Sequence, residues 1–236
     1  MNKSILQGAL FTVLTLFGGL LIGLVLGDIL FKLLPGSDIE NPSLGHMAIA
    51  AVPALGGFLA GGAAWGAAMG KVAGTADTRR MALAGMFGFA PITITLALGL
   101  SAAEPGLVAN YGAVIPVHRI FMLMFVPSAF IIAGISAWAL GRGLRDNALA
   151  VSMLWRVGGS AGLAFVIVTL GMELSGWVVG APGAAARATM VTVLAAGNLG
   201  VALVGGGVMG WLLWRAQTPS TNSVDHDFVS LRSVLC

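Results

Sequence analysis

Ionisable side chains beside apolar stretches are the first candidates for chemistry in this sequence, because such groups are costly to place in lipid. His46 and His118 begin two apolar runs, and Glu173 ends another. A neutral imidazole nitrogen at either histidine could bind the metal of a haem or a chlorophyll as an axial ligand. In the alternative, both histidines lie at the membrane interface and are satisfied by water and headgroups. We favour the alternative, because a haem pair normally lies deep within helices.

Two further sites carry charge inside or near apolar runs. Arg156 lies in SMLWRVGGSAG, where it could contact an anion or a lipid headgroup about two turns inside the membrane if its helix begins near Asn147. In the alternative, residues 144–155 lie along the interface and Arg156 extends to the cytoplasmic surface, which the adjacent tryptophan favours. Asp28 and Lys32 are one turn apart, and we expect a local ion pair near the headgroups.

The sequence contains no recognisable catalytic or metal motif. A nucleophile elbow, an HExxH pair and a P-loop are all missing. The single cysteine, Cys236, excludes an intramolecular disulfide and a cysteine-based metal site. Asn198, Thr93 and Thr95 offer a thin polar lining for a solute, and no pair of buried carboxylates suggests proton coupling. We therefore expect no catalytic residue and no metal site. An enzyme that acts on lipids through the two histidines and the glutamate is the third alternative.

Glycines at helical spacing form the most regular pattern in the chain. They recur every four residues in GGLLIGLVLG and in GGFLAGGAAWGAAMG. Four residues make about one helical turn, so each set gives a stripe without side chains. In lipid, such a stripe lets another helix backbone approach closely. We predict that the first two helices pack glycine to glycine, as a glycine zipper. The helix-packing residues are Gly19, Gly23, Gly27, Gly57, Gly61, Gly62, Gly66 and Gly70.

The composition requires lipid as the main solvent of these elements. Of 236 residues, 58% are hydrophobic and only 9% are charged, whereas soluble domains carry about a quarter charged residues. Six apolar runs can cross about 30 Å of hydrocarbon. We predict an all-α, polytopic bundle of six transmembrane helices over residues 1–216 and a flexible cytoplasmic tail over 217–236. The expected spans are 5–33, 46–70, 81–102, 120–140, 157–179 and 188–214.

The basic residues predict the orientation of the bundle. With a cytoplasmic N-terminus, nine of the twelve lysines and arginines fall on the inside, as the positive-inside rule requires. Both termini are then cytoplasmic, and we expect a multi-pass protein of the bacterial cytoplasmic (inner) membrane or an equivalent energy-transducing membrane. The same residues are scattered between apolar runs, so we expect no nucleic-acid partner.

Three tryptophans recur at a spacing of 73 residues. Trp65, Trp138 and Trp211 are each followed within a few residues by a lysine or arginine. Three tandem helical hairpins would produce this pattern. An aromatic belt at one membrane interface would produce it as well, and we favour the belt because little else aligns between the three segments.

Two functional hypotheses from different classes follow. The first is a non-catalytic accessory subunit that packs against a larger electron-transport, photosynthetic or transport complex and binds a pigment, a haem or lipid. Small-residue faces, short loops and a polar tail motivate it, and its partners would be membrane lipids and other membrane subunits. The second is a small-solute transporter or channel that gates through the helices containing Pro53, Pro91 and Pro127.

Overall fold

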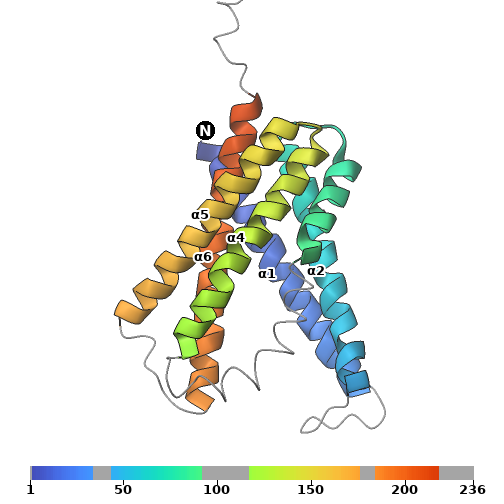
Figure 1. The fold of residues 1–236 in the computed structure, drawn as a ribbon. Coiled ribbons are helices and arrows are strands. Elements are labelled where there is room, and N and C mark those ends of the chain that lie inside the picture. Colours follow the sequence, from blue (N-terminus) through green and yellow to red (C-terminus); the bar gives the residue numbers. More distant parts are fainter. Residues whose placement is uncertain (1, 34–43, 92–116, 176–183, 218–236) are drawn as a thin grey trace, which may run out of the picture.

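The computed structural model describes residues 2–33, 44–91, 117–175 and 184–217 (Figure 1). Every regular element within these ranges is a helix, which confirms the predicted all-α class. The helices are α1 (Asn2–Leu33), α2 (Leu44–Val72), α4 (Val117–Gly143), α5 (Asn147–Leu174) and α6 (Ala184–Gln217). A further helical segment covers residues 78–91.

Four of these helices contain stretches that are long and apolar enough to cross a membrane, counted over the described residues. They are Lys3–Gly27 in α1, Phe125–Gly143 in α4, Asn147–Leu174 in α5 and Ala195–Gln217 in α6. Large apolar side chains such as Leu14, Leu163 and Leu203 point away from the bundle, which is the expected pattern where lipid is the solvent. These features indicate a membrane protein.

The helices pack as neighbours in a bundle whose first and last members touch. α1 contacts both α2 and α6, and α5 contacts both α4 and α6. The N-terminus lies beside the C-terminal end of α6 (Figure 1). At that end the Gln217 amide donates to the Val72 carbonyl at 2.6 Å, and the Arg80 guanidinium donates to the Arg142 carbonyl at 3.2 Å. These bonds connect helices that are far apart in the sequence.

Local capping explains where several helices begin and end at this face of the bundle. α2 is followed by Gly74, whose φ of 65° is the left-handed conformation that commonly ends a helix. The Asp77 carboxylate then accepts the Arg80 N–H at 3.1 Å and starts the 78–91 helix. In the same way the Asp146 carboxylate accepts the Leu149 N–H at 2.8 Å at the start of α5.

That cap changes one sequence-based expectation. From the sequence we expected a membrane span that starts at residue 157. We favoured the interpretation in which residues 144–155, before that span, lie along the membrane interface. Instead α5 begins at Asn147, about ten residues earlier, and its candidate span begins there too. The Asp146 carboxylate satisfies one of the backbone N–H groups that a helix start leaves unpaired, so the helix can start in this polar segment. Arg156 therefore lies within a continuous helix.

The first glycine stripe of α2 lies against α1. A Cβ built on Gly57 would approach the Gly19 carbonyl oxygen to 2.7 Å, and one on Gly19 would approach the Gly57 oxygen to 2.8 Å. A Cβ on Gly61 would likewise come within 2.8 Å of the Thr15 carbonyl oxygen. The two backbones are in direct contact at this crossing, which is possible only without side chains.

The second stripe of α2 has a different neighbour. A Cβ on Gly62 would lie 2.7 Å from the Gly85 carbonyl oxygen, and Gly66 meets the backbone of Met81 and Gly85. The second stripe therefore faces the 78–91 helix and not α1. A third crossing joins α1 to α6, where Gly8 meets the backbone of Gly206.

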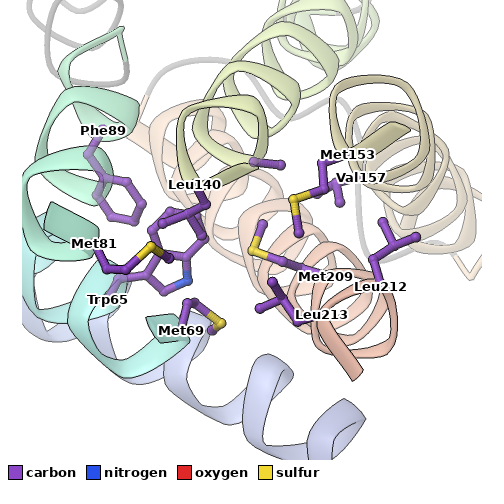
Figure 2. Close-up of a cluster of buried hydrophobic side chains, with 11 residues drawn as sticks. Trp65, Met69, Met81, Phe89, Leu140, Met153, Val157, Met209, Leu212 and Leu213 are labelled. Atoms are coloured by element: carbon purple, nitrogen blue, oxygen red, sulfur yellow. The ribbon is translucent and has the colours of Figure 1, made fainter. Parts of the chain in front are cut away.

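The buried core lies toward the end of the bundle at which α1 begins and α6 ends. Trp65 is 1% exposed, and Met69, Met81 and Leu140 gather around it (Figure 2). Its ring centroid lies 5.0 Å from that of Phe89. Methionine side chains fill irregular gaps well, so this cluster can join α2 and the 78–91 helix to α4, α5 and α6.

Candidate functional site

A central cavity of about 310 Å³ opens between the helices. All five labelled helices and the 78–91 helix contribute to its wall. Along α6 the lining extends from Ala195 to Met209, a distance of about 21 Å at 1.5 Å per residue. The cavity therefore begins beside the Trp65 cluster and extends deep into the bundle.

The wall of the cavity is apolar and rich in aromatic rings. Phe125 and Phe165 stack with centroids 6.3 Å apart, and Trp65 and Phe89 form a second aromatic pair. Among the described residues, no lysine, arginine, aspartate, glutamate or histidine lines the cavity. Such a wall suits an apolar molecule held by shape and dispersion. The aromatic lining residues are Phe17, Phe58, Trp65, Phe89, Phe125 and Phe165.

Two polar lining groups are used to hold helices together. The Trp65 indole N–H donates to the Thr12 hydroxyl oxygen at 2.9 Å, and that hydroxyl donates to the Gly8 carbonyl at 2.8 Å. The Ser136 hydroxyl donates to the Gly88 carbonyl at 2.8 Å. These bonds link α1 to α2 and α4 to the 78–91 helix. They satisfy polar groups that would otherwise be costly to bury.

Thr12 marks the point where three helices meet around the cavity. It belongs to α1, binds Trp65 of α2 and packs against Gly206 of α6. Because Gly206 has no side chain, α6 can approach the threonine closely. The junction fixes the position of the Trp65 ring in the wall.

The volume limits what the cavity can hold. An engineered cavity of about 150 Å³ in another protein takes up benzene. The cavity of about 310 Å³ therefore accommodates a molecule of roughly twice the volume of benzene. A bicyclic ring system or a short branched chain meets this limit.

The predicted histidine sites lie at helix ends. His46 is in the first turn of α2, His118 is in the first turn of α4, and Glu173 is in the last turn of α5. The side chains of both histidines lie outside the described part of the structure, as does that of Asp28. The same holds for Thr93, Thr95, Cys236 and the tail after Gln217, so the predictions about them stay predictions.

Arg156 is exposed on α5 and lies over a ring of α6. Its Cζ atom is 5.9 Å from the centroid of Trp211, and the Arg215 Cζ atom is 5.5 Å from the same centroid. Both distances fall within the range of cation–π contacts. Arg142 makes a similar contact with Trp138 at 5.9 Å.

The sequence pattern revealed only a small part of this site. It singled out Asn198, which does line the cavity. It missed the aromatic wall, because Phe58, Phe89 and Phe165 lie on different helices and follow no common spacing. It also missed Thr12, whose hydroxyl is indistinguishable in sequence from that of any threonine in an apolar run.

Comparisons with protein-family models, with curated proteins and with solved structures give no match to this chain.

Proposed function

We propose that this chain is a non-catalytic, multi-pass membrane protein that holds a small apolar molecule in its central cavity. One observation carries the proposal: a cavity of about 310 Å³ whose described lining contains no charged side chain. Acid–base chemistry needs a titratable group beside the reacting atoms. An aromatic and aliphatic wall instead favours binding of an apolar compound, such as a lipid-derived ring or chain.

The proposed topology has six spans with both termini in the cytoplasm. Four candidate spans support it, as does the position of the start of α1 beside the end of α6 at one face of the bundle. Basic residues collect at that face, including Lys71, Arg80, Arg142, Arg145 and Arg215 at or just beyond helix ends. The positive-inside rule assigns such a face to the cytoplasm, which suits a bacterial inner membrane or an equivalent energy-transducing membrane.

Within that membrane we propose that the protein acts as an accessory subunit of a larger complex. α1 supports this role, because its outer face carries a row of exposed leucines that includes Leu6, Leu10 and Leu14. Such a face packs equally well against lipid tails and another apolar helix. The bound molecule would then be shared with, or shielded for, the partner complex.

A carrier for small apolar solutes is the second candidate. Its support is the position of Pro127 within α4, directly before Ser128, which lines the cavity. Proline removes a backbone hydrogen bond and lets a helix bend. Bending of α4 there would change the cavity wall, as a gate must.

Photolabelling in membranes tests occupancy of the cavity. The probe is a short alkyl diazirine, which partitions into lipid and inserts into nearby side chains on illumination. Tandem mass spectrometry that assigns each label to a residue should find labels on Phe165 or Met209 in the wild-type protein, in addition to exposed positions such as Leu163. Ala133 lines the cavity, so Ala133→Phe should abolish the cavity labels and leave the Leu163 label unchanged.

The control for this experiment is the same substitution outside the cavity. Ala60 is exposed on α2, and Ala60→Phe should leave both sets of labels as in the wild type. Labelling of Leu163 alone in the wild-type protein would show that apolar molecules do not enter the cavity, and the proposal would fail.

The subunit role needs a separate measurement. The native protein would be extracted from membranes in mild detergent and separated by size. We expect a particle several times heavier than 23.9 kDa, in which mass spectrometry identifies partner chains. An absorption spectrum of the same fraction reports any pigment. A particle that contains only this chain would favour the carrier.

A further inference from the structure

Two guanidinium groups lie on one indole ring at the boundary between α5 and α6. Arg156 projects from α5, and Arg215 from α6, and both Cζ atoms lie within 6 Å of the Trp211 centroid. The ring thus holds two positive charges from different helices close together. Cation–π contact offsets part of the repulsion between them, but it leaves the outward N–H groups of Arg156 able to donate.

This pair lies toward the end of the bundle at which α5 begins and α6 ends. Arg156 lies nine residues after Asn147, about 14 Å along α5, and Trp211 lies six residues before the end of α6, about 9 Å along its axis. Trp155 beside the arginine is 62% exposed. Exposed tryptophans collect at the membrane–water interface, which favours a position of the two arginines near the lipid phosphates.

An apolar track continues from the arginines toward the middle of the bundle. On α5, Leu163 and Ile167 follow Arg156 at helical spacing and are exposed. On α6, Val204 precedes Trp211 by two turns and is exposed as well. At Gly159, a Cβ would meet nothing within 4 Å, so there is open space beside Arg156. The track offers a surface for an acyl chain.

The charge of Arg156 is not neutralised by the described residues. Its contact there is the Trp211 ring, and none of the described carboxylates forms an ion pair with it. The carboxylate of Asp146 binds the Leu149 N–H at the start of α5. Positive charge beside an exposed tryptophan and an apolar track complements a negatively charged lipid.

We propose that this α5–α6 surface, formed by Arg156, Trp211, Arg215, Leu163, Ile167 and Val204, binds an anionic phospholipid. The phosphate lies against the two guanidinium groups, and one acyl chain follows the apolar track. The bidentate geometry of arginine suits phosphate oxygens. This site is separate from the central cavity. The lipid proposal can therefore be correct or wrong whatever the result for the proposed function.

Native mass spectrometry of the full chain in detergent, titrated with phosphatidylglycerol or phosphatidylcholine, tests the site. We expect tighter binding of phosphatidylglycerol. Arg156→Gln and Arg215→Gln should each lower that affinity about five-fold, the effect of one basic residue near an anionic surface. Arg79→Gln removes an exposed arginine at the same end of the bundle. This control should change the affinity for phosphatidylglycerol by less than about two-fold.

Three further comparisons keep the result interpretable. Arg156→Lys keeps the charge and should retain most of the affinity, which covers the case in which the glutamine variant misfolds. Glycerol phosphate and inorganic phosphate should fail to displace the lipid, because they lack the chain. Displacement by either would make this a simple anion site, and equal losses in Arg156→Gln and Arg79→Gln would mean only general attraction to charge. Either result would overturn the proposal.

Discussion

The crossing of α1 and α2 predicts opposite effects for two adjacent glycines. Gly56 and Gly57 share a helix, a composition and nearly the same depth. A Cβ at Gly56 would meet nothing within 4 Å, whereas one at Gly57 would lie 2.7 Å from the Gly19 carbonyl oxygen and 2.9 Å from the Gly23 Cα. Replacing each by alanine gives the same gain in helix propensity, so the difference between the two variants isolates the contact between helices.

The size of that difference follows from the distances. An ordinary contact needs about 3.4 Å, so Gly57→Ala must push α1 back by ~0.7 Å from its 2.7 Å approach. The neighbouring atoms are backbone and cannot rotate away. Overpacking of this kind costs about 1–3 kcal/mol, so Gly57→Ala should be less stable than Gly56→Ala by that amount.

Reversible unfolding in mixed micelles, followed by circular dichroism, measures the free energy of both variants. The same pair of substitutions on the facing helix provides a replicate: a Cβ at Gly18 would meet nothing within 4 Å, while one at Gly19 would lie 2.8 Å from the Gly57 carbonyl oxygen. Gly19→Ala should be destabilised relative to Gly18→Ala by a similar amount. Equal stabilities within both pairs would refute the close crossing of α1 and α2.

Two further substitutions test the contacts that position the helices. Thr12→Val removes the hydroxyl that accepts the Trp65 indole N–H, and a double-mutant cycle with Trp65→Phe in the same unfolding assay should give a coupling of about 0.6–1.7 kcal/mol. Zero coupling would mean that the bond contributes nothing. Asp146→Ala removes the cap that accepts the Leu149 N–H and should cost about 1 kcal/mol. Asp146→Asn should retain most of that stability, and equal losses in both variants would argue against the cap.

Composition and spacing were sufficient to predict the all-α class and the presence of apolar helices of membrane length. These properties are local, because the backbone bonds of a helix in lipid are satisfied within the helix itself. The start of α5 was harder to predict. Asp146 caps a segment that contains polar residues, and hydropathy alone gives no weight to a cap.

The choice of partner for each glycine stripe could not be read from the sequence. Gly57 lies against α1, but Gly62, only five residues later, lies against the 78–91 helix. Gly8 lies against the backbone of Gly206, although the two glycines are near opposite ends of the sequence. Spacing defines a face of a helix, whereas the partner of that face depends on how all the helices pack.

Trp65 illustrates the same limit. We favoured an aromatic belt for the three equally spaced tryptophans. Trp211 and Trp138 do lie beneath arginines, but Trp65 is 1% exposed and bonded to Thr12. The belt is therefore wrong for Trp65. Small residues around it, such as Gly62 and Gly66, let the 78–91 helix approach closely enough to cover it.

The most direct test of the proposed function is to identify what the cavity contains in native membranes. The wild type, Ala133→Phe and Ala60→Phe would be extracted in parallel, and the small molecules released on denaturation would be weighed by mass spectrometry. We expect one apolar compound that fits about 310 Å³, present with the wild type and Ala60→Phe and lost with Ala133→Phe. The same set of bulk lipids from all three proteins would contradict the idea that the cavity binds a specific molecule.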